Sequence, residues 1–131
     1  MRHVLRVAYV ISLTVGSVCA QPAPAPIPES RAQLGYATPA QAMTALRARP
    51  DVRFTEQRGW TVAEDRANQA VWSFVPPGHP AYPAVVRRQI VQRNGSLLAV
   101  TQVLCGATKP ACDTLVREFQ QSNQAIRQSL H

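Results

Sequence analysis

The residues best suited to chemistry in this chain lie in a proline-rich stretch past its midpoint. His79 and Tyr82 stand within residues 76–83, a segment of eight that holds four prolines. Prolines fix the backbone, and ordered loops often carry binding or catalytic side chains. His79 and Tyr82 are therefore candidate site residues. The alternative is a rigid crossover between two strands, with Tyr82 packed against the core.

Three arginines follow this stretch, at Arg87, Arg88 and Arg93. A cluster of guanidinium groups favours an anionic partner, such as an acidic protein, an anionic glycan or a lipid head group. Arg87 and Arg88 are neighbours in a predicted strand, so they point to opposite faces and at most two of the three share a surface. The alternative is ordinary solubility charge.

Cys105 and Cys112 form the third candidate group. In an exported chain, such a pair first indicates a structural disulfide, here between the end of a strand and the first turn of a helix. Free thiols or a redox-active or metal-binding pair are the alternatives. A redox pair favours two intervening residues, whereas six intervene here, and zinc requires four ligands. We expect a disulfide, no metal and no cofactor.

The residues for catalysis are few. A serine or cysteine nucleophile needs an oriented base, usually histidine, and beyond the N-terminal segment there are only His79 and His131. The carboxylates stand among polar neighbours without a motif, and there is no glycine-rich phosphate loop. An enzyme is therefore disfavoured. A minor enzyme or redox accessory, centred on the proline-rich loop or the cysteine pair, stays open as the alternative.

The N-terminus is typical of a secretory signal peptide. Arg2 and Arg6 precede an apolar run at positions 7–15, and Val18-Cys19-Ala20 supplies small residues for cleavage after Ala20. The run is shorter than the roughly 20 residues of a membrane span. Acylation of Cys19 fits poorly, because Gly16-Ser17-Val18 replaces the usual Leu-Ala-Gly type sequence. We expect a periplasmic or secreted protein with no transmembrane span after cleavage.

Removing residues 1–20 lowers the formal net charge from +7 to +5, because Arg2 and Arg6 leave with the signal. Alternating prolines then predict a stiff tether over residues 21–36. Residues 37–131 suffice for a single domain with one modest core. An exported protein rarely meets nucleic acid, so we expect no nucleic-acid partner despite the basic charge.

The pattern of this domain predicts an α+β fold. Thr38-Pro39-Ala40-Gln41 forms a capping box that begins a short helix ending before Pro50. A long amphipathic helix begins near Thr108. Between them, short connections predict an antiparallel meander of about four strands; Val52 to Val62 is either two short strands or one strand bulged at Gly59. The long C-terminal helix packs on the sheet, pinned by one disulfide.

The clearest strands are residues 84–93 and 96–104, which flank Asn94-Gly95, a strong signal for a two-residue hairpin turn. That turn places Ile90 opposite Ala99 and Arg88 opposite Thr101, although a bulge or a longer loop stays possible. The alternating aromatics Trp60, Trp72 and Phe74 favour a core; the alternative is a platform for a ligand.

Residues 71–119 resemble short exported proteins of Gram-negative bacteria that are uncharacterised. The resemblance lies in Trp72-Ser73-Phe74, Gly78-His79-Pro80-Ala81-Tyr82-Pro83, and Leu104-Cys105 followed by Ala111-Cys112-Asp113. It implies export and brings no activity with it. Together with the residues above, it leads us to expect a small non-catalytic envelope protein that binds a protein partner or an anionic envelope polymer.

Overall fold

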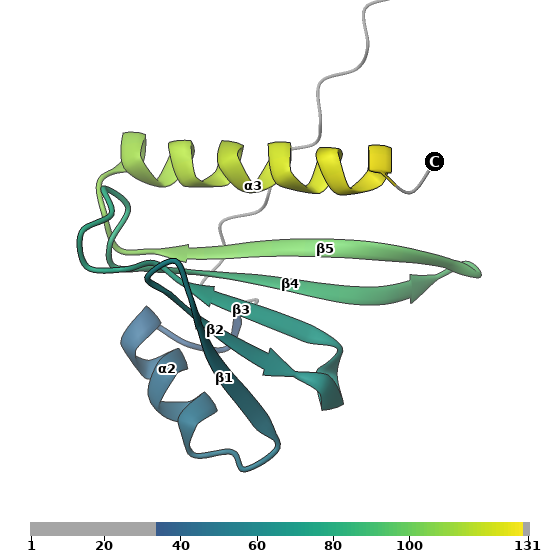
Figure 1. Cartoon of the computed structure of the whole chain (residues 1–131), viewed down its shortest axis with the longest axis horizontal. Coiled ribbons are helices and arrows are strands. Elements are labelled where there is room, and N and C mark those ends of the chain that lie inside the picture. Colours follow the sequence, from purple (N-terminus) through teal and green to yellow (C-terminus); the bar gives the residue numbers. More distant parts are fainter. Residues whose placement is uncertain (1–33, 130–131) are drawn as a thin grey trace, which may run out of the picture.

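A five-stranded antiparallel sheet, covered by one helix on each face, organises residues 34–129, the part of the chain that the computed structural model describes (Figure 1). The strands lie in chain order: β1 (Val52–Gln57), β2 (Trp60–Asp65), β3 (Ala70–Phe74), β4 (Ala84–Arg93) and β5 (Ser96–Cys105). A short 3-10 turn, Arg66–Asn68, links β2 to β3. Helix α2 (Pro39–Arg47) covers one face and α3 (Lys109–Ser129) lies along the other. The predicted α+β class and meander are confirmed, with five strands where the sequence predicted about four.

The additional strand arises from a tight turn at Arg58 and Gly59. Both residues have positive φ, 52° and 85°, and Gln57 pairs directly with Trp60. Two consecutive left-handed residues make the hairpin turn that matches strand twist. Glycine adopts this conformation freely, but arginine does so seldom, so the dipeptide is a weak turn signal.

The predicted hairpin about Asn94-Gly95 is confirmed, including its register. Asn94 and Gly95 have φ of 52° and 78°, and Ile90 lies opposite Ala99. Pairing runs from Arg93 and Ser96 to Ala84 and Cys105 without a bulge. Strand β3 accompanies β4 only as far as the pair Ala70–Gln89. Residues 90–99 therefore extend past the other strands as a two-stranded arm, called the hairpin arm below (Figure 1).

The capping box that begins α2 is confirmed. Thr38 Oγ1 accepts a hydrogen bond from the Gln41 amide (3.2 Å), and Gln41 Oε1 accepts one from the Ala37 amide (3.1 Å). The helix buries Ala42 and Leu46 on the sheet, in a cluster that also contains Val52, Ala63, Trp72, Phe74, Val85 and Leu104. Satisfied amides and an apolar stripe let so short a helix persist.

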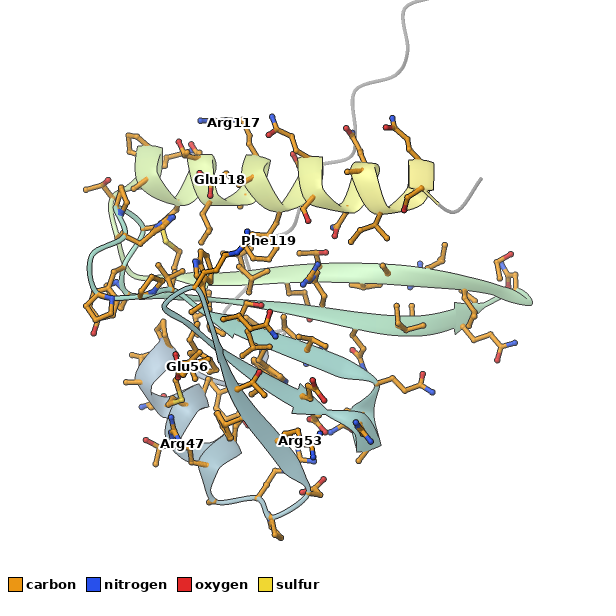
Figure 2. The ribbon with its side chains drawn as sticks, viewed as in Figure 1. Arg47, Arg53, Glu56, Arg117, Glu118 and Phe119 are labelled. Atoms are coloured by element: carbon orange, nitrogen blue, oxygen red, sulfur yellow. A yellow bond between two sulfur atoms is a disulfide. The ribbon has the colours of Figure 1, made fainter. Side chains whose placement is uncertain are left out.

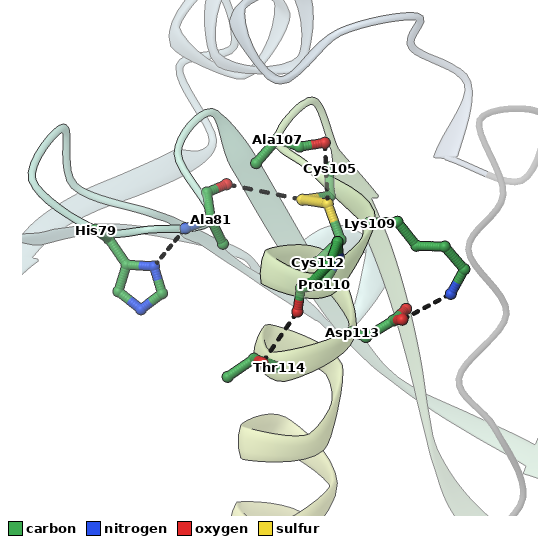
Figure 3. The surroundings of a disulfide bond; sticks show 9 residues. All are labelled: His79, Ala81, Cys105, Ala107, Lys109, Pro110, Cys112, Asp113 and Thr114. Atoms are coloured by element: carbon green, nitrogen blue, oxygen red, sulfur yellow. Dashed lines mark hydrogen bonds and ion pairs between the residues drawn. A yellow bond between two sulfur atoms is a disulfide. The ribbon is translucent and has the colours of Figure 1, made fainter.

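Helix α3 is packed most firmly in its first turns. Cys112 and Leu115 are buried against Val86 and Val103, whereas Ile126, further along, is 49% exposed. The predicted disulfide joins Cys105 to Cys112, with Cα atoms 5.9 Å apart (Figure 3). The helix is thus anchored at its start and projects over the hairpin arm.

The predicted signal peptide, residues 1–20, and most of the predicted tether lie outside the described residues. Leu34 is only 4% exposed and Tyr36 packs edge-on against Trp72, with ring centroids 5.9 Å apart. The packed domain therefore includes residues before the predicted boundary at 37. Within 34–129, no helix is both long and apolar enough to cross a membrane.

Candidate functional site

A groove of about 510 Å³ lies between α3 and the sheet and is called the α3 groove below. Its walls come from the end of β1, the β1–β2 turn, β2, β3, β4 and α3. It is lined by Gln57, Arg58, Trp60, Val62, Ser73, Arg88, Glu118, Phe119 and Ser122. Figure 2 shows Phe119 pointing from α3 toward the sheet, whereas Arg117 points away from it. A volume of this size is in the range of small-molecule sites.

Two rings of the α3 groove wall, Phe119 and Trp60, continue as a row to His79 in the proline-rich loop. Trp60 lies between Phe119, 5.9 Å away between ring centroids, and His79, 5.5 Å away. Trp60 and Phe119 are half-buried, so parts of both rings face solvent. Tilted and edge-on contacts at these distances are favourable, and they hold the rings as a rigid surface.

Arg88 supplies the positive charge of the α3 groove. Its guanidinium carbon lies 5.4 Å from the centre of the Phe119 ring, and Thr101 is its neighbour across the β4–β5 pair. Burial lowers the pKa of Arg88 below the usual value of an arginine, although arginine stays charged in proteins. No carboxylate of residues 34–129 forms an ion pair with it. Arg88 is therefore a cation without an ion pair in this part of the chain, in a groove that also contains a second arginine, Arg58, and the Glu118 carboxylate.

His79 lies at the end of the ring row, where its two nitrogens have neighbours. Nδ1 accepts a hydrogen bond from the Ala81 amide (3.1 Å; Figure 3), and Nε2 lies 3.8 Å from Glu118 Oε2. In the neutral ring, Nε2 then carries the proton and faces the carboxylate. No nitrogen lone pair is left open for a substrate, so this geometry suits a structural or rim position better than a general base.

Arg87 is on the opposite face of the sheet, as the strand alternation predicted. It lies over Trp72, 5.4 Å from the ring centre, and donates to Gln89 Oε1 (2.8 Å). Burial lowers its pKa, and the nearby Asp65 partly offsets this. It lines a separate polar cavity of about 210 Å³ beneath α2.

Asp65 supports the structure around that second cavity. It is 2% exposed and accepts two hydrogen bonds from Arg49 (2.7 and 2.9 Å), with Asn68 donating two more. The Arg49 guanidinium is the main cause that lowers the pKa of Asp65, and Arg49 also pairs with Asp51. The Asp65 carboxylate is thus saturated by its own neighbours, whereas the nearby Trp72 Nε1 and Arg87 Nε are buried without a hydrogen-bond partner among the described residues.

The two remaining predicted residues lie apart from the α3 groove. Tyr82 is 49% exposed and borders an apolar depression of about 320 Å³ beside Pro39 and Met43. Arg93 is exposed next to the turn of the hairpin arm. The five candidate binding residues are therefore spread over separate surfaces, and Arg88 alone of the five lines the groove, with His79 at the end of its ring row.

The cysteine pair offers little access for redox chemistry. Cys105 is 8% and Cys112 is 3% exposed, and their sulfurs lie against the Ala81 and Ala107 carbonyl oxygens at 3.7 and 3.6 Å (Figure 3). Exchange requires a thiolate to reach a sulfur atom, which this packing hinders. Among the described residues, no group of three His, Cys, Asp or Glu could hold a metal ion.

Phe119 was not singled out from the sequence, and Trp60 was grouped with Trp72 and Phe74 as an expected core residue. The structure separates these rings: Trp72 and Phe74 are 4% and 6% exposed, whereas Trp60 borders the α3 groove. The alternation of side chains along β2 could have separated these rings. Trp60 and Val62 point to the α3 face, whereas Ala63, which pairs with Trp72, points to the α2 face.

Comparisons of this chain with protein families, with curated proteins and with solved structures found no match.

Proposed function

We propose that this is a small exported, non-catalytic binding protein whose α3 groove holds an anionic group of an envelope polymer or a partner protein. The observation that carries the proposal is Arg88, a half-buried cation with no ion pair among residues 34–129, set beside the exposed parts of Trp60 and Phe119. A charged group is costly to bury without a partner. A bound carboxylate or phosphate would supply that partner.

Besides Arg88, the groove contains a second cation, Arg58, and one carboxylate, Glu118, which lies 3.8 Å from His79 Nε2. Arg88 can donate two parallel hydrogen bonds to a carboxylate or phosphate. Trp60 and Phe119 offer ring surface to the apolar or planar part of the ligand, and Gln57 and Ser122 offer polar atoms at the rim. This combination favours an anionic group attached to a ring or a short chain over a bare inorganic ion.

Export is supported by the disulfide, because such bonds persist in oxidising compartments. The N-terminal signal pattern points to the same compartment. The geometry of His79 supports a non-catalytic role, since both of its nitrogens already face protein groups.

The test is titration of the purified protein with an acidic oligosaccharide, an acidic peptide and the neutral counterpart of each, followed by calorimetry. Binding of one acidic ligand, and loss of about 10–100-fold in affinity in Arg88→Gln, is the expected result, since a hydrogen-bonded charge contributes about 1.5–3 kcal/mol. Arg87→Gln is the matched control, because its side chain lies on the opposite face.

The two acidic ligands distinguish a glycan from a protein partner. His79→Gln should leave affinity within about threefold, because its ring lies at the end of the row and not in the groove wall. Equal binding by wild type and Arg88→Gln, or binding of neither acid, would contradict the proposal.

A further inference from the structure

The cavity beneath α2 holds two buried N–H groups that lack a hydrogen-bond partner. Trp72, which is 4% exposed, and Arg87 both line this cavity of about 210 Å³. Trp72 Nε1 and Arg87 Nε are buried, and neither donates a hydrogen bond to a group of residues 34–129. Buried donors without an acceptor are rare, because each one costs free energy. Two of them in one cavity point to an acceptor that comes from outside the chain.

The two donors lie close together on one face of the sheet. Trp72 and Arg87 are direct partners across the β3–β4 pair, and the Arg87 guanidinium carbon lies 5.4 Å from the centre of the Trp72 ring. Arg87 also donates to Gln89 Oε1 (2.8 Å), and Gln89 Nε2 donates to the Asn68 carbonyl oxygen (3.0 Å). These bonds hold the guanidinium beside the ring, so that one small ligand can meet both donors.

The charges that line the cavity favour a monovalent anion. Asp65, the one carboxylate of the lining, accepts two hydrogen bonds from Arg49 and two from Asn68, so its acceptor positions are occupied. Arg49 in turn pairs with Asp65 and Asp51, whereas Arg87 forms no ion pair within residues 34–129. Two arginines and one aspartate give the lining a net charge of +1. A dianion would be repelled by Asp65 more strongly than a monoanion.

The size and the donors of the cavity define the ligand further. Most small-molecule pockets measure about 300–1,000 Å³, so this smaller cavity admits a ligand of only a few heavy atoms. A water molecule would accept the hydrogen bonds but leave the Arg87 charge unpaired, whereas a carboxylate supplies acceptor oxygens and the opposite charge together. We propose that this cavity binds a small monocarboxylate, such as acetate, as a structural anion that accepts hydrogen bonds from Trp72 Nε1 and Arg87 Nε.

This site is separate from the α3 groove in place and in ligand. Asn68 is exposed and Arg49 and Gln89 are half-buried, so the cavity meets solvent at these residues, on the α2 face of the sheet. A glycan or a protein chain of the kind proposed for the α3 groove is too large for this volume. The bound carboxylate therefore completes the polar groups beneath α2 and stabilises the fold, and it plays no part in binding at the α3 groove.

The first test is thermal unfolding in sodium acetate, with sodium chloride as the matched salt and acetamide as the neutral isostere. A ligand that binds only the folded chain raises the melting temperature, and for a dissociation constant of about 10 mM the rise in 100 mM acetate is about 5–10 °C. Arg87→Gln should lose this rise, whereas Arg88→Gln, on the opposite face, should keep it. Arg87→Lys, which keeps the charge but lacks the Nε–H group, should weaken acetate binding about tenfold.

The indole N–H groups give a second readout in the wild type. The chain contains two tryptophans, Trp60 and Trp72, and Trp60→Phe assigns their two indole signals in a nitrogen–proton correlation spectrum. Acetate should move the Trp72 indole proton downfield and saturate at the dissociation constant found by thermal unfolding. An unmoved Trp72 signal at about 200 mM acetate, an equal response to chloride or acetamide, or a melting rise retained in Arg87→Gln would overturn the proposal. Each of these results leaves the Arg88 test of the α3 groove unaffected, because that test uses other ligands.

Discussion

Arg87 and Arg88 are adjacent in the sequence, yet they belong to two different environments. Arg87 lies under α2 beside Trp72, Gln89 and the saturated Asp65 cluster; it donates to Gln89, but among the described residues it has no ion pair and its buried Nε has no hydrogen-bond partner. Arg88 lies in the α3 groove beside Phe119, without an ion pair among the described residues. Strand alternation alone separates them.

Under the proposed function, the two faces of the sheet would divide stability from binding. On the α2 side, hydrogen bonds within the chain saturate Asp65, so changes there are expected to act on folding, although Trp72 Nε1 and Arg87 Nε are buried without a hydrogen-bond partner among the described residues. The α3 side is held by a disulfide at one end and leaves a cation and two rings partly open, which is the surface of the proposed binding site. The predictions below test that division.

The largest stability effect is expected for the disulfide that fixes α3. Replacing both Cys105 and Cys112 by Ser should lower the free energy of unfolding by about 2–3 kcal/mol, because the unfolded chain gains the entropy of an open loop. Urea unfolding followed by tryptophan fluorescence measures the loss. A change below about 0.5 kcal/mol would mean that packing alone holds the helix.

Next in size is the carboxylate that completes the α2 side. Asp65→Asn should lower the free energy of unfolding by about 2 kcal/mol, since Asp65 is buried and accepts charge-assisted hydrogen bonds from Arg49. Asp51→Asn is the control: its carboxylate is 47% exposed, and its removal should cost clearly less. An equal loss of unfolding free energy in Asp65→Asn and Asp51→Asn would contradict the stabilising role given to the buried Asp65 carboxylate.

The same carboxylate makes stability depend on acid. Arg49 holds the pKa of Asp65 in the folded state below its ordinary value, so the stabilisation is complete above about pH 5. It is lost as the pH falls from about 4 through the lowered pKa. Urea midpoints between pH 7 and 2 should therefore fall more steeply for the wild type than for Asp65→Asn. Parallel curves would refute this origin.

The smallest effect compares the two arginines directly. Arg88→Leu should leave the free energy of unfolding unchanged or raise it by up to about 1 kcal/mol, because it removes a half-buried cation that lacks an ion pair among residues 34–129. Arg87→Leu should lower it by about 1 kcal/mol, through loss of its contacts with Gln89 and Trp72. Thermal and urea unfolding of Arg88→Leu and Arg87→Leu show whether each substitution raises or lowers the free energy of unfolding.

Features that depend on neighbouring residues could be predicted from the sequence. The α2 cap, the Asn94-Gly95 turn, the pairing of Ile90 with Ala99 and the disulfide all follow from short-range rules, and the structure confirms them. The turn at Arg58-Gly59 was left open, because arginine seldom adopts the positive φ that it has here.

The α3 groove could not be predicted in this way. Trp60 and Phe119 are far apart in the chain, and their proximity depends on where α3 crosses the sheet. Both look like core residues by periodicity, because half-buried and fully buried aromatics give the same pattern. The position of the helix over the sheet is a tertiary property, which no local signal encodes.

Because α3 is anchored at Cys112, a tilt of the helix about this point moves its two ends by different amounts. From Cys112 to Ser129 the helix spans about 26 Å, so a tilt of about 5° at the disulfide moves the far end by about 2 Å. Phe119, seven residues from the fulcrum, moves by only about 1 Å. The aromatic wall therefore stays nearly stationary while the end beside the hairpin arm takes up most of any displacement.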